Sequence, residues 1–573
     1  MKKVIPQLIL AITILLLTVI YPVVVNAQKK DVTELERRTK LAIEKAYPAC
    51  VRIWGYDTVK KVQTSSQFSG VVVDPNGTVL TVSHAIQPNR TYKLRFPDGK
   101  ETIAVALGKM GLPEMQNRPD LGMMKITEKG NWPFAELGWS YSLKVNEPCM
   151  SISYPETLNQ LLPTIRFGKI NSVLTEWGFI DSSCKMEPGD SGGALFDLFG
   201  RVIGLHSRCD TLESKNYEVP IDSYRKFWED LKITQNYTVI PKGSQEKRID
   251  PKEKSINSLD FLDRLPSAFS FLQDLNKHQC ILQSIKGSSG ITARATIFDY
   301  KGKTWLVSKN SIVGENVSTF ENGQQITLGI IARDIPNDLV LLSSRVKIGH
   351  PITMKDLKSP TSITKEELGT FLISPIDGRL QISVLSSRLI DLPKKFSVGF
   401  IGMAANFQNG KAIVTRLLPG SPATKAGIKQ GDHVMSINGI AISDADRYNT
   451  QMQQSVVGDT LVIVINHGDI AQTINIVAIQ RPVSSHVAEQ FAGGKSTRLD
   501  DFSNVFVHDA VIKPEECGGA VFDRNGNFCG INIARFSRTA TIVMPSQKIV
   551  ELIEKESKEL LKHNITNDEK IKD

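Results

Sequence analysis

The chain has 573 residues, of which 41% are hydrophobic and 23% charged, and its formal net charge is +9. This composition is that of ordinary globular protein and leaves room for about three or four domains. The charge is small for the length, and no basic stripe is interleaved with aromatic residues, so we expect no nucleic-acid partner.

The N-terminal segment has the organisation of an export signal. Lys2 and Lys3 give a charged start, residues 8–21 form an apolar run, and residues 25–27 have the small-residue pattern that precedes a cleavage site. The apolar run is shorter than the ~20 residues that a membrane-spanning helix requires. We therefore expect residues 1–27 to be removed and the mature protein to be periplasmic or secreted. An uncleaved N-terminal membrane anchor is the alternative.

Residues 45–230 consist of short runs in which apolar and polar side chains alternate. Turn sequences, such as those at 74–77 and 96–99, separate these runs. The alternation predicts short β-strands that form barrels. The preceding segment, 31–46, has helical spacing and is expected to pack outside them.

Three polar residues stand at the ends of these predicted strands, in the order His84, Asp120 and Ser191. A serine hydroxyl is a poor nucleophile unless a base takes its proton. A histidine can be that base, and an aspartate can hold the imidazole in the required tautomer and stabilise its charged form. The arrangement therefore predicts a Ser-His-Asp triad that hydrolyses peptide bonds through an acyl-enzyme on Ser191.

The turn that carries Ser191 is rich in glycine, with the sequence Glu-Pro-Gly-Asp-Ser-Gly-Gly over residues 187–193. Glycine allows the backbone to come close to a substrate carbonyl. We expect the N–H groups of Gly189 and Ser191 to point at one position, where an oxyanion can form.

At these motifs the chain resembles the trypsin-like serine proteases, and within them the HtrA/DegP type. The similarity covers residues 45–230 and is carried by the segments 69–77, 120–126 and 192–204. The resemblance implies a double β-barrel, with the histidine and aspartate in the first barrel and the serine in the second. It also implies unfolded or damaged proteins as substrates.

Two residues depart from the pattern of the HtrA type. Asp190 and His206 stand where that type usually has asparagine. Asp190 resembles the aspartate that binds a newly formed N-terminus in secreted digestive proteases. No Ile-Val-Gly-Gly segment is present to supply such a terminus, so we expect no activation of that kind.

The resemblance also bears on the cysteines and on specificity. It implies a disulfide between Cys184 and Cys209 that would brace the specificity pocket, and two unpaired thiols are the alternative. It places Lys185 near the floor of that pocket and residues 205–207 along its wall. Small or medium apolar side chains are the expected cleavage preference.

A second copy of the same pattern follows the first domain, which we assign to 28–235. Residues 236–263 are polar and predict a linker. The motifs then recur over 264–396 and 483–560, while 561–573 is expected to be a tail.

The second copy has lost the chemistry of the first. Asp338 keeps the aspartate position, Cys517 takes the serine position, and Ser311 or Asn310 falls where the histidine should be. Glu515 replaces the oxyanion-loop glycine. A cysteine nucleophile needs a nearby cation or histidine to lower its pKa, and residues near 311 supply no histidine. We expect a degenerate domain.

Residues 397–482, between the two halves of this copy, resemble a PDZ domain of the HtrA-associated kind. Such a domain binds an extended peptide as an added strand at a sheet edge. By the resemblance, the backbone N–H groups of Phe400, Ile401 and Gly402 bind the terminal carboxylate of the peptide.

The predicted fold class is mostly β, with two trypsin-like double β-barrel domains in tandem and a PDZ domain that interrupts the second. The predicted function is that of an exported serine endopeptidase acting on unfolded proteins, with peptide C-termini as PDZ ligands and no metal or other cofactor. The alternative is a client-binding scaffold with little or no protease activity. HtrA relatives commonly form trimers, but a tandem repeat could supply such contacts within one chain, so a homo-oligomer and a monomer both stay open.

Overall fold

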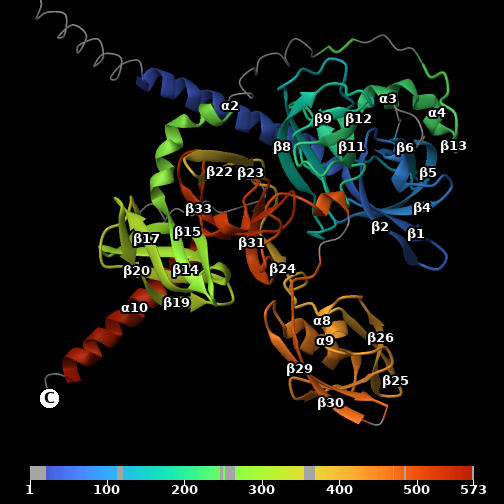
Figure 1. Cartoon of the computed structure of the whole chain (residues 1–573). Coiled ribbons are helices and arrows are strands. Elements are labelled where there is room, and N and C mark those ends of the chain that lie inside the picture. The colour runs from blue at the N-terminus through green and yellow to red at the C-terminus, as the bar shows by residue number, and fades with distance from the viewer. Residues whose placement is uncertain are drawn as a thin grey trace, which may run out of the picture. The chain divides into compact units, whose positions relative to one another are not determined.

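The computed structural model describes residues 21–111, 120–244, 249–251, 265–353, 368–468, 470–482 and 486–570. The chain forms two compact units: a barrel unit (Met1–Ile390, His486–Gly494 and Phe506–Asp573) and an inserted unit (Asp391–Ser485 and Lys495–Val505) (Figure 1). Most of the predicted signal segment lies outside the described residues. No helix in the described part of the chain is long and apolar enough to cross a membrane.

The first domain contains two barrels, which follow the long helix α2 (Tyr21–Ala46). The strands of the first barrel are β1 (Cys50–Asp57), β2 (Val62–Val72), β3 (Thr78–Thr81), β4 (Thr91–Arg95), β5 (Glu101–Gly111) and β6 (Asp120–Ile126). Those of the second are β7 (Pro148–Ser153), β8 (Thr164–Ser172), β9 (Ile180–Ser182), β10 (Ala194–Phe196), β11 (Val202–Cys209) and β12 (Asn216–Pro220), followed by helices α3 (Ile221–Lys226) and α4 (Trp228–Lys232). The first sheet runs β5-β4-β1-β2-β3-β6 and returns to β5, and the second closes as β10-β11-β12-β9-β8-β7.

The alternation of apolar and polar residues along the strands gives each strand one buried face, which allows these sheets to close into barrels. Along β5, inward residues such as Ala104 and Ala106 are fully buried, while the residues between them are partly exposed. Small inward side chains leave room for Val51, Ile53 and Leu94 from the neighbouring strands. Period-two patterning with one buried face is what a barrel strand requires.

The second domain repeats this strand order. Its elements are α6 (Leu265–Ala268), η5 (Ser270–His278), β14 (Gln279–Lys286), β15 (Ser289–Tyr300), β16 (Lys303–Lys309), β17 (Glu315–Glu321), β18 (Gln324–Thr327), β19 (Gly329–Asp334), β20 (Leu339–Ser344), β21 (Ile352–Thr353), β22 (Phe371–Ile376), β23 (Arg379–Val384), β24 (Ile390–Leu392), β31 (Phe502–His508), β32 (Ala520–Asp523), β33 (Phe528–Arg535), β34 (Thr541–Pro545) and α10 (Ser546–Lys570). Its second sheet runs β23-β22-β32-β33-β34-β31-β24, so β31 corresponds to β9. The inserted unit therefore stands where the first domain has only the short connection 173–179.

The first and second domains contact each other directly. The Glu36 carboxylate on α2 accepts hydrogen bonds from the N–H of Phe371 at 2.9 Å and from Arg524 Nε at 3.1 Å. On β8, the Ile165 N–H donates to the Ser386 carbonyl at 3.0 Å. These contacts explain why the two domains form one unit.

The expected linker and tail differ from the structure. Residues Asn236–Tyr237 form strand β13, parallel to β5. Arg201 forms a bidentate contact with the buried carboxylate of Asp250, at 2.8 and 3.2 Å. The linker prediction is therefore wrong for these described parts of 236–263, which are bound to the first domain. The expected tail at 561–573 continues helix α10 as far as Lys570.

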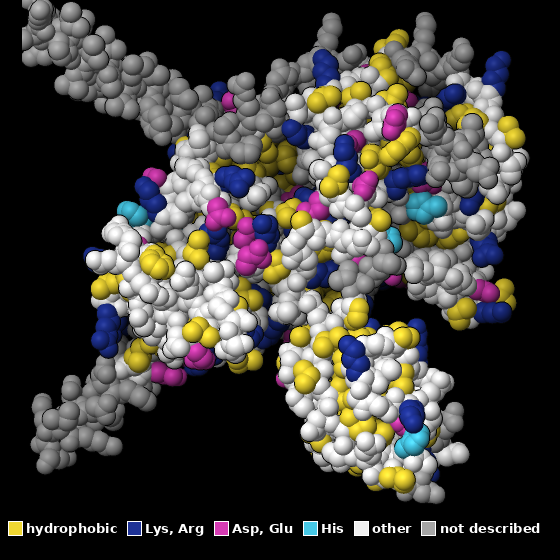
Figure 2. Space-filling view, viewed as in Figure 1, with side chains coloured by type: hydrophobic (Ala, Val, Ile, Leu, Met, Phe, Trp, Pro, Cys, Tyr) yellow, Lys and Arg dark blue, Asp and Glu magenta, His cyan; other side chains and the backbone are white. Residues whose placement is uncertain are grey.

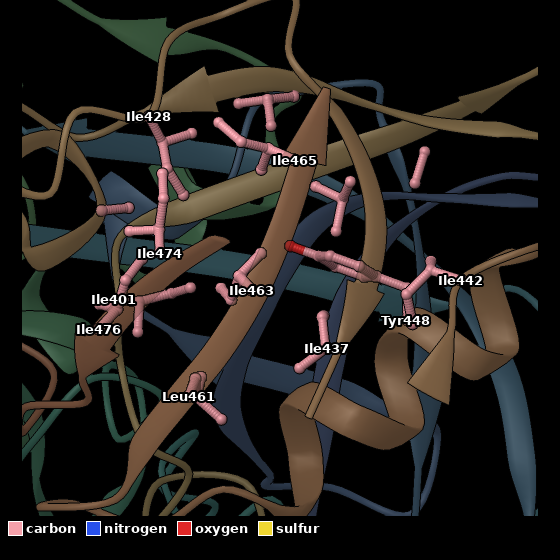
Figure 3. Close-up of a cluster of buried hydrophobic side chains, with 14 of the residues drawn as sticks. Ile401, Ile428, Ile437, Ile442, Tyr448, Leu461, Ile463, Ile465, Ile474 and Ile476 are labelled. Carbon is pink, nitrogen blue, oxygen red and sulfur yellow. The ribbon is translucent and has the colours of Figure 1, made fainter. Parts of the chain in front are cut away.

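The inserted unit is a separate small sheet with two helices. Its elements are β25 (Met403–Gln408), β26 (Lys411–Leu417), α8 (Pro422–Lys425), β27 (His433–Ile437), β28 (Ile440–Ala441), α9 (Ala445–Gln454), β29 (Thr460–His467) and β30 (Ile470–Val477). The sheet runs β25-β26-β27-β29-β30, which leaves β25 at an edge. Buried aliphatic residues from β29, among them Ile463 and Ile465, pack against Ile437 and Tyr448 (Figure 3). Hydrophobic side chains on the visible face of this unit are scattered among polar atoms (Figure 2).

The boundary of this unit is wider than predicted. The Asp500 carboxylate accepts hydrogen bonds from the N–H groups of Lys395 at 2.7 Å, Phe396 at 2.5 Å and Ser397 at 3.1 Å. Because this carboxylate binds the start of the unit, the segment around Asp500 belongs to the inserted unit, whose boundary at Val505 falls within β31.

We predict that Ile463→Ala destabilises the inserted unit by about 2–5 kcal/mol, because it opens a cavity at a fully buried site. Val462→Ala, one position along β29 and 38% exposed, is the matched control and should cost no more than about 0.5 kcal/mol. Amide hydrogen exchange of β26 and β29 measures the opening free energy of each variant. Equal exchange in the two variants would contradict the assigned register.

Candidate active site

The structure brings the three residues predicted to form a triad together from three separate segments. His84 lies in a single 3₁₀ turn (Ser83–Ala85) after β3, Asp120 begins β6, and Ser191 stands in the turn before β10. His84 Nε2 is 3.0 Å from Ser191 Oγ, and His84 Nδ1 is 2.8 Å from Asp120 Oδ2. The pairing of β3 with β6 places the histidine and the aspartate side by side, and the second barrel supplies the serine.

Asp120 is almost fully buried and saturated with hydrogen bonds. Its carboxylate accepts from Ser83 Oγ at 2.7 Å, from Ser207 Oγ at 2.6 Å and from the His84 N–H at 3.1 Å, in addition to the imidazole. Burial alone would raise the pKa of this carboxyl, but the hydrogen bonds from His84, Ser207 and Ser83 hold the pKa below its usual range. The group therefore stays ionised and can stabilise a charged imidazole.

Sequence reasoning did not assign Ser83 or Ser207 to this network. Ser207 had been expected only along a pocket wall. The sequence signal for this role of Ser207 is its position next to His206 in β11, the strand that pairs with β10 directly after the serine turn. The hydroxyls of Ser83 and Ser207 fix the aspartate from two sides, so His84 has one orientation.

The backbone of the serine turn leaves two N–H groups without a partner among the described residues. The Pro188 carbonyl accepts from the Glu156 N–H at 2.8 Å, and the Asp190 carbonyl accepts from the Gly193 N–H at 2.7 Å. Because C=O and N–H point in opposite directions across a trans peptide, the Gly189 and Ser191 N–H groups are turned away from these contacts. They are the two donors expected to bind an oxyanion.

Glycine is required at position 189. Its φ is +96°, and a Cβ there would lie 2.5 Å from the Glu156 nitrogen and 2.6 Å from the Tyr154 oxygen. A side chain would therefore meet both strain and a backbone clash. The turn keeps its shape only with glycine.

Asp190 forms a buried ion pair with Arg166. Arg166 Nη1 lies 2.7 Å from Asp190 Oδ2, and the two side chains are 2% and 0% exposed. The same carboxylate accepts from Ser153 Oγ and from the Glu187 N–H, each at 2.8 Å. Asp190 therefore has its cationic partner on strand β8 of the same barrel.

The predicted disulfide between Cys184 and Cys209 is wrong, because both are free thiols. Cys184 is fully buried in the second barrel, where its Sγ lies 3.9 Å from that of Cys149. Cys209 is partly exposed at the end of β11. The serine turn is braced by the Arg166 ion pair instead of a bridge.

Two of the residues expected to shape a specificity pocket, Lys185 and His206, do not line a cavity with the triad in the described part of the chain. Lys185 lines a cavity of about 390 Å³ whose other residues include Asp509 of the second domain but none of the triad. His206 is fully buried, and burial lowers its pKa to about 3, so it is neutral. Its Nδ1 lies 3.2 Å from Oε1 of Glu218, whose pKa burial raises. The cleavage preference stays a prediction.

The second domain has no triad at the equivalent positions. The Ser311 N–H donates to Asp338 Oδ1 at 2.7 Å, as the His84 N–H does to Asp120, so Ser311 occupies the histidine position. Cys517 is buried, and its N–H donates to the Pro514 carbonyl at 3.3 Å. The Cys517 N–H, which corresponds to the Ser191 N–H, therefore already donates to a backbone carbonyl. Glu515, which replaces the oxyanion-loop glycine, lies in a 3₁₀ turn.

The peptide-binding residues predicted in the inserted unit need one correction. The Phe400 N–H donates to the Ile479 carbonyl at 2.8 Å, so it is not free to bind a carboxylate. The N–H groups of Ile401 and Gly402 have no acceptor among the described residues and directly precede the edge strand β25. Two of the three predicted donors therefore remain available.

Comparison with known proteins gives the following similarities. The model of the trypsin-like peptidase domain matches residues 68–205, and that of the PDZ domain matches residues 399–477. A probable periplasmic serine endoprotease, DegP-like, of Hahella chejuensis is 24% identical over 423 residues, which cover 71% of this chain and 80% of that protein. The serine protease HTRA1 of Xenopus tropicalis is 26% identical over 216 residues, 36% of this chain and 45% of that protein. The crystal structure of the serine endoprotease from Yersinia pestis aligns with 78% of this chain and 98% of that chain, at 15% identity and a TM-score of 0.30.

We predict a pH dependence of stability from Asp120. Its pKa is lower in the folded state than the ordinary value of about 3.9, so it stabilises the fold above that value, and the stabilisation is lost as the pH falls through the lower folded pKa. The unfolding free energy of Asp120→Asn should therefore fall less steeply than that of the wild type between about pH 5 and pH 2. Denaturant unfolding followed by tryptophan fluorescence measures both slopes. Ser207→Ala, which removes one hydrogen bond to the carboxylate, should give an intermediate slope, and identical slopes in all three proteins would contradict the assignment.

Proposed function

Because the chain is a serine protease of the HtrA/DegP type that carries a PDZ domain, we propose that it is an exported endopeptidase that cleaves unfolded or damaged proteins. Ser191 is the nucleophile, His84 the general base and acid, and Asp120 the group that orients the imidazole. The observation that carries the proposal is the position of His84, within hydrogen-bond distance of both Ser191 and Asp120.

The chemistry follows from this geometry. His84 Nε2 accepts the Ser191 Oγ proton while Oγ attacks the substrate carbonyl carbon, and the carbonyl oxygen becomes an oxyanion bound by the N–H groups of Gly189 and Ser191. The imidazolium then gives its proton to the leaving amine, and the peptide C–N bond breaks to leave an acyl-enzyme. A water molecule, deprotonated by His84, attacks the ester and releases the acid. Asp120 stabilises the imidazolium in both steps and keeps its own charge.

The shape of the two binding regions supports an unfolded substrate. A trypsin-like site needs an extended peptide segment that can reach Ser191, and the free edge of β25 binds an extended segment as an added strand. A folded protein rarely offers such segments, because its backbone groups are already paired. Unfolded chains offer many of them.

The proposal of export rests on the charged and apolar N-terminal segment and on relatives named as periplasmic proteases. A client-binding scaffold is the competing function, because the second domain has no competent nucleophile. The hydrogen bonds that Asp120 accepts favour the enzyme, as do the N–H groups of Gly189 and Ser191, which have no acceptor in the described part of the chain.

We predict that Ser191→Ala abolishes cleavage of a reduced, alkylated and therefore unfolded protein, lowering the rate by at least roughly 1,000-fold. Cys517→Ala is the matched control, because it changes the equivalent residue of the second domain, and it should keep wild-type activity. Gel analysis of fragments and labelling by a fluorophosphonate give independent readouts. Loss of activity in Cys517→Ala alone would transfer the nucleophile to the second domain, and binding without cleavage by the wild type would favour the scaffold.

We predict that the inserted unit discriminates a free peptide C-terminus from an amidated one. The carboxylate would accept charge-assisted hydrogen bonds from the Ile401 and Gly402 N–H groups, so amidation should weaken binding by about 10- to 100-fold. Calorimetric titration of the full-length Ser191→Ala protein, which cannot consume the peptide, measures the two affinities. Equal affinities would exclude a carboxylate-binding loop here.

A further inference from the structure

One loop of the second domain reaches the two loops of the first domain that flank Ser191. We call residues 535–540, which connect β33 to β34, the arginine loop. One target is the serine turn with its approach, 185–190, and the other is the connection 210–216 between β11 and β12. Buried side chains of the arginine loop contact the connection 210–216 directly and reach the serine turn through Asn216 and Arg166.

Arg538 joins the two targets. Its guanidinium is fully buried and donates to the carbonyls of Asp210 and Leu212, the latter at 2.9 Å. It also lies 3.4 Å from Asn216 Oδ1, which accepts the Met186 N–H at 3.2 Å. One arginine of the second domain therefore fixes the connection 210–216 and, through Asn216, the start of the serine turn.

Arg535 adds a charged contact to the same connection. Its Nη2 lies 2.7 Å from Glu213 Oε1, and the two side chains are 1% and 16% exposed. The same nitrogen donates to the Arg538 carbonyl at 2.9 Å, so Arg535 also fixes the arginine loop itself. Burying a guanidinium this deeply is costly unless its N–H groups have acceptors. The Glu213 carboxylate is one of the acceptors of Arg535.

One hydroxyl of the arginine loop contacts the arginine that pairs with Asp190 of the serine turn. Thr539 Oγ1 lies 3.4 Å from Nη2 of Arg166, the partner of Asp190. Ser537 Oγ lies 3.3 Å from Thr539 Oγ1 and so fixes that hydroxyl within the loop. The second domain thus extends the hydrogen-bond network that holds the two N–H donors next to Ser191.

We infer that the second domain is an intramolecular activator of the first, and that Arg538 is its principal positioning residue. The inference rests on the proposed role of Ser191. Arg538 holds the serine turn and the connection 210–216 in the geometry in which the Gly189 and Ser191 N–H groups converge. The second domain can lose its own triad and keep this function, because the function requires only its fold and the arginine loop.

The test compares two arginines of the full-length protein that both bind across the domain contact. Arg538→Ala removes the hydrogen bonds to the connection 210–216, including the one to Asn216, which binds the serine turn. Arg524→Ala is the matched control, since Arg524 binds Glu36 on α2 and contacts neither target loop. The readouts are kcat and KM for a peptide substrate, the second-order rate of fluorophosphonate labelling of Ser191, and the thermal unfolding midpoint.

We expect Arg538→Ala to lower kcat and the labelling rate by about 100-fold, the cost of a misplacement of about 1 Å at a reacting centre, with little change in KM. Arg524→Ala should lower the unfolding midpoint and leave both rates near those of the wild type. Glu213→Gln, which keeps the shape but removes the charge opposite Arg535, should lower kcat in the same direction and serves if Arg538→Ala does not fold. Unchanged rates in the folded Arg538 or Glu213 variant, or equal losses in Arg524→Ala, would overturn the inference. A wild-type protein that neither cleaves nor labels would instead overturn the proposed function.

Discussion

The ion pair between Arg166 and Asp190 is the interaction on which the surroundings of Ser191 depend. Two charges removed from water are costly unless each finds nearly all of its hydrogen-bond partners. Asp190 finds Arg166, Ser153 and the Glu187 N–H, and Arg166 finds Thr164 and Thr539 in addition. These partners come from the second barrel, the serine turn and the second domain. The shape of the turn is therefore fixed by a network that needs all three parts in place.

The second domain shows how a buried aspartate persists after its histidine is lost. In the first domain Asp120 faces an imidazole that can become positively charged. In the second, Lys309 Nζ lies 2.6 Å from Asp338 Oδ2, and both side chains are fully buried. Ser311 supplies the hydrogen bonds that the histidine backbone and Ser83 give in the first domain. A lysine has replaced the imidazole as the partner of the carboxylate, so the carboxylate has become a structural group.

The sequence was sufficient where the determinants are local. The strands that carry His84, Asp120 and Ser191 and the interruption of the second domain follow from short motifs and from their repetition. The motifs left Ser311 and Asn310 both open for the histidine position, and only the hydrogen bond to Asp338 selects Ser311. It was insufficient where a partner is distant in the chain. Nothing near Cys184 indicates that its neighbour is Cys149, and nothing near Phe400 indicates that its N–H is already bound by Ile479.

Polar composition was also a misleading guide to packing. The segment that contains Asp250 has the composition of a linker, yet the Asp250 carboxylate is buried in an ion pair with Arg201. The segment that contains Asp500 likewise belongs to the inserted unit only because its carboxylate binds three successive N–H groups. The arginines at 535 and 538 are a third case, because Glu213 and Leu212, which accept from them, lie more than 300 residues away in the chain.

The interruption of the second domain also sets the order in which the protein can be completed. Leu372 pairs with Asp523 across the whole inserted unit, so this sheet cannot form until the ribosome has passed the inserted residues. Domains generally fold as units from the N-terminal end during synthesis. The first domain and the inserted unit can therefore fold while the arginine loop does not yet exist. The serine turn receives these contacts only when the chain is nearly finished, so the part of the protein made last completes the surroundings of a residue made in its first third.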